Sequence, residues 1–205
     1  MPIKRAVPVF LLLWVSVAGQ SAVAQEQKTD AAPAQDAATL QREAMKKLDP
    51  WVGVWKGSGW ILMGRNQPRQ EFTITETIQS KLGGRVLLVE GVGRGKDAKT
   101  GAEVDTHNTL AVLSYDEIAK TYRFRTHEAM GRALDVEGKA LDGGGLEWGF
   151  RDETRGATIR FTIRLDGNRW HEVGEASMNG KTWYKFLEMT LERQGAASAP
   201  SGGKN

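Results

Sequence analysis

The stretch ATIRFTIRLDGNRWHEVGEAS, residues 157–177, decides the fold class. Its first half alternates Ile, Phe, Ile and Leu at positions 159 to 165 with Arg and Thr, the period of two that is typical of a strand with one buried face. Asp166-Gly167-Asn168 then supplies turn residues, and a second run follows from Arg169 to Ser177. The stretch therefore predicts two antiparallel strands joined by a tight turn.

The same pattern recurs along most of the chain. Runs of alternating residues follow one another, separated by turn signals such as Gly83-Gly84 and Asn179-Gly180, without a crossover helix. A meander of about ten strands has two exposed edges if it stays flat, and closure into a barrel removes them. We therefore predict an all-β protein, a single up-and-down antiparallel β-barrel. The predicted strands are Trp51–Leu62, Arg69–Ser80, Arg85–Gly93, Thr106–Tyr115, Thr121–Glu128, Arg132–Leu141, Leu146–Asp152, Ala157–Leu165, Arg169–Ser177 and Lys181–Glu192.

Two further features concern the architecture. A two-sheet sandwich is the alternative to the barrel, but such folds use longer connections, and only Arg94–Asp105 is a long one. A barrel of about ten strands is too wide for side chains to fill, so we expect an internal cavity. Before the strands, residues 38–48 carry Leu40, Ala44 and Leu48 at helical spacing, which predicts one short N-terminal helix that ends at Asp49-Pro50.

The N-terminus indicates export. Lys4 and Arg5 precede an apolar run at Val7–Ala18, and Ala22-Val23-Ala24 is a small-x-small cleavage site. We therefore expect a signal peptide at residues 1–24, cleaved after Ala24, and a periplasmic or secreted protein; an uncleaved membrane anchor is the alternative. The remaining domains are then a disordered spacer at 25–37, the helix and barrel at 38–194, and a disordered tail at 195–205.

Composition excludes several functions. Without Lys4 and Arg5 the chain has 26 basic and 25 acidic residues, so we expect no nucleic-acid partner and no stable membrane insertion after signal cleavage. The absence of Cys excludes disulfides, thiolate metal sites and Cys nucleophiles. The three histidines have no metal-binding spacing, so no metal and no cofactor is expected.

Several motifs resemble known families. Residues 48–59, LDPWVGVWKGSG, contain a Gly-x-Trp at Gly53 and Trp55, which resembles the entry to lipocalin-like and fatty-acid-binding-like barrels, including the haem-binding nitrobindins. The rest of the mature chain resembles the exported bacterial domain-of-unknown-function family 1579, in KLGGR at 81–85, the Tyr115-Asp116 turn, WHEVGE at 170–175, NGKTW at 179–183 and EMTLER at 188–193. The resemblance implies a lipocalin-like barrel whose closed end is formed by Gly53 and Trp55, with Arg193 stacked on the indole.

The candidate site residues are carboxylates and indoles. Glu76, Glu90 and Glu172 each alternate in phase with apolar residues, so we expect them near the cavity. Either they form the polar end of a ligand cavity, or neighbours such as Arg85 or Arg125 satisfy them. The expected ligand-cavity residues are Trp148, Trp170, Trp183, Glu76, Glu90 and Glu172.

The leading hypothesis is a non-enzymatic barrel that binds a small apolar or amphipathic ligand. One alternative is an acid/base enzyme that uses Glu76, Glu90 and Glu172, although no catalytic residue is assigned. Another is a structural or interaction module of the cell envelope. Haem is not expected, because His171 alternates out of phase with Trp170 and therefore points outward.

Overall fold

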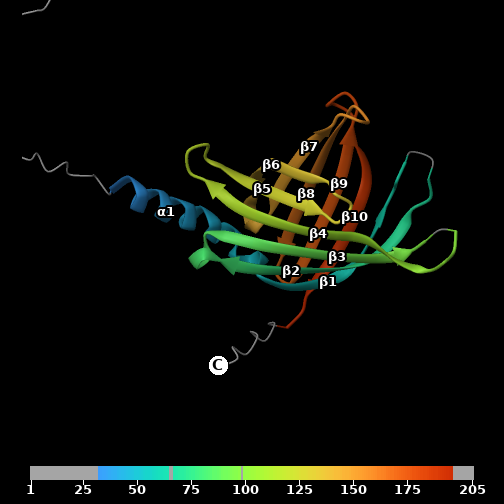
Figure 1. The fold of residues 1–205 in the computed structure, drawn as a ribbon, viewed down its shortest axis with the longest axis horizontal. Coiled ribbons are helices and arrows are strands. Elements are labelled where there is room, and N and C mark those ends of the chain that lie inside the picture. The colour runs from blue at the N-terminus through green and yellow to red at the C-terminus, as the bar shows by residue number, and fades with distance from the viewer. Residues whose placement is uncertain (1–31, 65–66, 98, 196–205) are drawn as a thin grey trace, which may run out of the picture. The chain divides into compact units, whose positions relative to one another are not determined.

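The chain forms a closed barrel of ten antiparallel strands preceded by one α-helix (Figure 1). The computed structural model describes residues 32–64, 67–97 and 99–195. The order around the barrel is β1-β10-β9-β8-β7-β6-β5-β4-β3-β2, so the prediction of an up-and-down barrel is confirmed. The strands are β1 Gly53–Ile61, β2 Gln70–Lys81, β3 Val86–Lys96, β4 Glu103–Asp116, β5 Thr121–Glu128, β6 Ala133–Ala140, β7 Leu146–Asp152, β8 Ala157–Asp166, β9 Arg169–Ser177 and β10 Tyr184–Arg193.

The segment Arg94–Asp105, the long connection that a two-sheet sandwich would use, forms the end of a β-hairpin. β3 and β4 both extend into the segment Arg94–Asp105, and they pair as far as Lys96 and Glu103. The Asp97 carboxylate accepts hydrogen bonds from the backbone N–H groups of Lys99 and Thr100, which stabilises the turn. Consecutive strands therefore pair throughout, and the pairing of β1 with β10 closes the barrel.

The N-terminal helix differs from its predicted limits. Helix α1 spans Ala32–Met45, so it begins before Ala38, within the expected spacer, and the 3₁₀ helix η1, Lys46–Trp51, continues past Pro50. A 3₁₀ turn accommodates this proline because its fixed φ suits a helical turn even though it has no N–H to donate. Among the described residues, no helix has the length and apolar character needed to span a membrane. The expected signal peptide lies outside the described residues, as does the tail beyond Gly195.

Residues from α1 and η1 close one end of the barrel, which we call the closed end. Met45, Leu48 and Trp51 are buried there and belong to the same apolar cluster as Trp55 and Trp170. Backbone carbonyls satisfy the polar atoms of these rings: Trp51 Nε1 donates to Gly144 O and Trp55 Nε1 donates to Trp51 O, both at 2.7 Å. The Tyr122 hydroxyl donates to Ala44 O at 2.7 Å, which ties α1 to β5.

The other half of the interior is less tightly filled, and we call it the open half. At the closed end, interior residues such as Leu113 and Leu146 are fully buried. Further along the strands, the interior residues Trp148, Phe161 and Leu187, which follow one another in register across β7, β8, β9 and β10, are only partly buried. All of these side chains point to the same interior face, yet their burial decreases along the strands. This decrease indicates that solvent enters the barrel from one side.

Candidate ligand-binding site

Two glutamates from opposite sides of β1 lie inside the barrel. Glu76 on β2 pairs with Trp55 and Gly91, and Glu172 on β9 pairs with Ile163 and Met189. They are 6% and 7% exposed. Strands β1 and β10 lie between β2 and β9, and there Trp55 is the cross-strand neighbour of Glu76 while Met189, opposite Gly59, is the neighbour of Glu172.

Both carboxyl groups keep their protons at pH values above those at which glutamate usually ionises. Burial raises the pKa of Glu76 to about 8, and the charge of Glu172 adds to this effect. Burial also raises the pKa of Glu172 to about 7, while a hydrogen bond from Trp170 Nε1, at 3.2 Å, acts in the opposite direction. The pair therefore retains protons near pH 7.

Neither of the arginines suggested as partners reaches the pair. Arg85 donates to the carbonyls of Ala38 and Leu82, and Arg125 forms an ion pair with Asp135 on the outer face. Within the part of the chain that the structure describes, no hydrogen bond reaches the Glu76 carboxyl group. The two carboxyl groups thus have no cationic partner among the described residues, and protonation rather than an ion pair limits the cost of burying them.

Glycine and threonine shape the space around Glu76. A Cβ atom at Gly91 would lie 2.7 Å from Glu76 Oε1 and 3.0 Å from Thr109 Oγ1, so the carboxyl group rests on the bare backbone of β3. The Thr109 hydroxyl in turn lies 3.0 Å from His107 Nε2. Glu76, Thr109 and His107 therefore form a polar strip across β2, β3 and β4.

The expectation for Glu90 is corrected: this residue is exposed on the outer face. Lys81 pairs with Val86 across a loop of four residues, so even-numbered residues of β2 face odd-numbered residues of β3. Glu90 therefore pairs with Thr77, and Glu76 pairs with Gly91. An odd loop would have brought the two carboxylates together, but the loop is even, and a shift of one residue moves every side chain to the other face.

The three candidate indoles occupy different places. Trp170 is 2% exposed and packs edge-on against Trp51 and Trp55, so its placement in a ligand cavity is corrected to the closed end. Trp148 faces the open half, stacked on Phe161 with 4.4 Å between ring centroids. Trp183 lies just before β10, with the Arg160 guanidinium 4.1 Å from its ring centroid.

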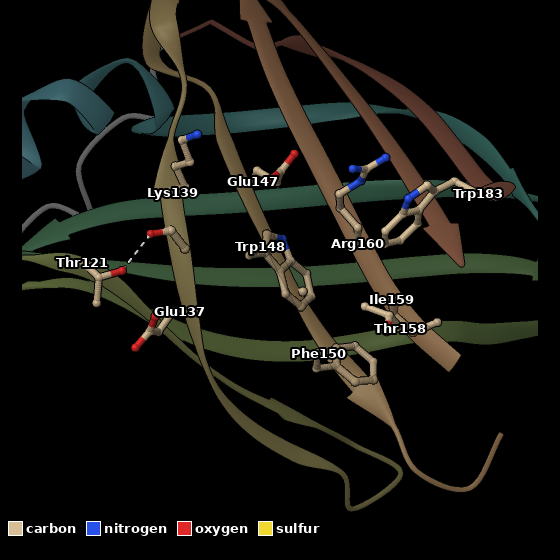
Figure 2. Close-up of a pocket in the computed structure, with 12 residues that line it drawn as sticks. Thr121, Glu137, Lys139, Glu147, Trp148, Phe150, Thr158, Ile159, Arg160 and Trp183 are labelled. Carbon is tan, nitrogen blue, oxygen red and sulfur yellow. Dashed lines mark hydrogen bonds between the residues drawn. The ribbon is translucent and has the colours of Figure 1, made fainter. Parts of the chain in front are cut away.

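Trp148 and Trp183 both line a cavity of about 400 Å³ in the barrel wall (Figure 2). Here β6 and β7 pair only over Gly138–Ala140, whereas β5 and β6 pair over six positions. The lining combines interior residues, including Trp148 and Phe150, with outer residues, including Lys139 and Arg160, so the cavity crosses the wall. The indole N–H of Trp148 is buried there without a hydrogen-bond partner among the described residues.

Sequence reasoning missed three polar interior residues: His107, Thr109 and Glu128. They share the interior face of β4 and β5 with Ala111 and Leu113. The alternation that starts at Leu113 could have revealed them, but Val112 and Leu110 place apolar residues on the outer face too and conceal the phase. Desolvation lowers the pKa of His107, although solvent reaches part of this residue at the rim.

The remaining histidines lie on the outer face. His171 Nε2 is 3.1 Å from Glu188 Oε1, and His127 is exposed. In the described ranges no three side chains of His, Cys, Asp or Glu gather closely enough to hold a metal ion.

The closed end contains the Gly-x-Trp residues. The guanidinium of Arg193 lies over the Trp55 ring, 4.1 Å from its centroid. Arg193 also donates to the carbonyls of Val52, at 2.6 Å, and Pro50. Gly53 has φ +141°, and a Cβ atom there would lie 2.9 Å from Arg193 Nη1, so this position requires glycine.

These features together define a lipocalin-like barrel: ten antiparallel strands, one end closed by a helix and tryptophans, and a polar interior beyond them. Residues 41–193 match the model of the family described as "Protein of unknown function (DUF1579)". The chain belongs to this family.

Solved structures support the same fold. The crystal structure of Rv2717c from M. tuberculosis is similar with a TM-score of 0.54 and 15% identity, over 74% of this chain and 97% of that chain. The S-type phycobiliprotein lyase CPES from Guillardia theta is similar with a TM-score of 0.51 and 11% identity, over 80% of this chain and 98% of that chain. No curated protein matches the sequence.

Proposed function

We propose that this protein is exported and binds a small amphipathic molecule in the open half of the barrel. The observation that carries the proposal is the change in burial along the interior, from fully buried rings at the closed end to partly exposed Trp148 and Phe161 beyond it. A packed structural module would bury its interior rings at both ends. The cavity between β6 and β7 adds a route from the surface toward the same rings.

The chemistry of the open half suits an amphipathic ligand. Trp148 contacts Phe161 and Phe124, at centroid distances of 4.4 and 4.8 Å, so one side of the interior is aromatic. The strip with Glu76 and Thr109 on the opposite side of the barrel is polar. Ligand sites commonly combine an apolar lining with a few convergent polar groups.

Native mass spectrometry of protein purified from its own periplasm tests the proposal. We expect an additional mass bound to the folded protein that is lost on denaturation. Nile red, a neutral dye, should also bind, and Trp148→Ala should weaken its binding at least fivefold. Trp60→Ala is the matched control, because Trp60 lies on the outer face of β1 under Arg69. Absence of both a bound mass and dye binding would refute a ligand-binding barrel.

Export has its own test. The N-terminal sequence of the protein recovered from the periplasm or medium should begin at Gln25, after cleavage behind Ala24. A chain that keeps Met1 and remains in the cytoplasm would refute export without affecting the ligand proposal.

Acid/base catalysis is a second candidate, favoured by the buried pair Glu76 and Glu172, which has no cationic partner among the described residues. Two neighbouring carboxyl groups with raised pKa values can hold and accept a proton near pH 7. One structural neighbour is named as a lyase, so a barrel of this fold is compatible with catalysis. A co-purified ligand that is chemically converted on incubation, by the parent protein but not by Glu76→Gln, would support this candidate; an unchanged ligand would exclude it.

A further inference from the structure

The barrel wall has its shortest ladder between β6 and β7. We call this join the β6–β7 seam; it comprises Ala133–Ala140 and Leu146–Asp152. Three positions pair there, Gly138–Ala140 with Leu146–Trp148, whereas every other pair of neighbouring strands shares at least six. The ladder bonds that join strands are therefore fewest at this seam.

The two ends of the seam are held differently. At the closed end Leu146 is fully buried, and Gly144, two residues before it, accepts the hydrogen bond from Trp51 Nε1. At the other end the strands lead into hairpin turns, where a Cβ atom at Gly131 or at Gly156 would meet nothing within 4 Å. Separation of the two strands therefore starts at the hairpin turns, while the closed end keeps the strands joined.

Beyond the ladder, ring contacts span the seam. Arg132, directly before β6, lies over the Phe150 ring of β7, with 5.8 Å between the guanidinium carbon and the ring centroid. This distance is near the upper limit for a cation–π contact, so the attraction is weak. Phe124 of β5 packs against Trp148 of β7 at 4.8 Å. These contacts between side chains are easier to break than a continuous ladder, because each depends on the position of one flexible group.

Two buried donors without partners line the cavity at the seam. Trp148 Nε1 and Arg160 Nε are the buried side-chain nitrogen and oxygen atoms that lack a hydrogen bond among the described residues. Both residues line the cavity of about 400 Å³ (Figure 2). A buried donor without a partner destabilises the closed arrangement, since water would satisfy this donor if it could reach it. Widening of the seam admits water to the cavity lining and so offsets part of the cost of breaking the ladder.

We propose that the β6–β7 seam is a lateral gate, and that its strands part from the hairpin turns to admit the ligand into the barrel. This inference rests on the proposed ligand-binding function. The cavity lining leads from outer residues such as Lys139 to Phe150 and Trp148, and Trp148 stacks on Phe161 in the open half. An apolar chain that enters here stays in contact with rings along its path.

A disulfide across the seam tests the gate. The chain has no Cys, so Lys139→Cys with Glu147→Cys introduces a single pair, at direct cross-strand partners on the outer face. Antiparallel partners lie about 4.5–5.5 Å apart at Cα, a separation that a disulfide can bridge. We expect Nile red to associate at least tenfold more slowly with the oxidised variant than with the same variant after reduction by dithiothreitol. Stopped-flow fluorescence gives the rates, and a thiol assay confirms the disulfide.

The control disulfide joins strands that pair along their whole length. Thr162→Cys with Val173→Cys links β8 to β9 on the outer face, and its oxidation should change the association rate less than twofold. Oxidised and reduced seam variants that differ less than twofold, or an equal slowing in the control, would overturn the gate and leave the ligand-binding function intact. Absence of Nile red binding by the parent protein would overturn both.

A second variant decides the question if the Cys variants do not fold. Arg132→Ala removes the guanidinium over Phe150, so the seam should open more readily and Nile red should associate at least threefold faster. Arg69→Ala is the matched control, because it removes an arginine from the Trp60 ring on the outer face of β1, away from the seam. Association of Arg132→Ala at the parental rate, or an equal acceleration in Arg69→Ala, would refute the gate.

Discussion

Arg193 and Trp55 are direct cross-strand partners, and the guanidinium of one covers the indole of the other at 4.1 Å. Replacement by Arg193→Ala removes this stack and leaves the carbonyl of Val52 without its donor. We expect the free energy of unfolding in urea to fall by about 2–4 kcal/mol. Arg193→Lys should recover less than half of this loss, since an ammonium group cannot donate to two carbonyls while lying flat on a ring. Arg169→Ala, at an exposed position, should change stability by less than about 0.5 kcal/mol; an equal loss there would refute the role of Arg193.

Gly53 should not tolerate a side chain. Its φ of +141° disfavours any other residue, and an added Cβ would displace Arg193 from the carbonyls it binds. Gly53→Ala should therefore lower the free energy of unfolding by about 2–4 kcal/mol. Gly195→Ala is the comparison, because nothing lies within 4 Å of a Cβ there. Thermal melts monitored by circular dichroism compare the two variants. Equal melting temperatures for Gly53→Ala and Gly195→Ala would contradict the prediction.

The buried acids make stability depend on pH. The folded pKa values of about 8 for Glu76 and about 7 for Glu172 lie above the ordinary value of 4.5, so the folded state binds more protons than the unfolded state between pH 4.5 and 8. The free energy of unfolding should therefore fall as pH rises through this window, by at most about 1.4 kcal/mol per pH unit for each retained proton. His107, with a lowered pKa, acts in the opposite direction below pH 6.5, so urea midpoints are best compared at pH 7 and 8.5. Glu76→Gln should flatten the slope and Glu90→Gln should not; an unchanged slope in Glu76→Gln would contradict the assignment.

The short pairing of β6 with β7 should be visible in hydrogen exchange. Beyond Gly138, the β6 amides that point toward β7 have no ladder partner on that strand. These amides, between Ala133 and Glu137, should exchange much faster than the amides of β5 that pair with β4. Exchange followed by NMR on the folded protein measures this, and uniform protection across β5, β6 and β7 would show that the wall is closed.

Most of the fold follows from the sequence. All ten strands occur where alternation predicts them, with ends that differ by a few residues, because each strand has one apolar face and each turn carries Gly, Asp or Asn. The start of α1 was missed, since the Ala-rich segment from Ala32 has high helix propensity but no apolar stripe to signal it. Of the predicted apolar stripe, Leu48 is buried as expected but Leu40 is exposed, and Met45, which the stripe did not include, is buried.

The positions of the site residues depend on features of the structure that the alternation of the sequence alone does not predict. The inward direction of Glu76 and Glu172 follows from their apolar neighbours two residues away. The direction of Glu90 depends on whether the loop that follows β2 is odd or even, which is a property of the turn. Trp170 lies at the closed end because of its position along the barrel axis. The alternation within a strand predicts whether a side chain points inward or outward, but not where along this axis it lies.

The pairing of β1 with β10 also has a kinetic consequence. The first strand cannot meet its partner until synthesis has reached Arg193, so a nascent or truncated chain has an open sheet with two bare edges. Contacts between segments so distant in sequence slow folding, because a long loop must be ordered before the contact forms. The ten residues of β10 therefore complete the barrel. A ribosome that stops before them releases a polypeptide prone to aggregate.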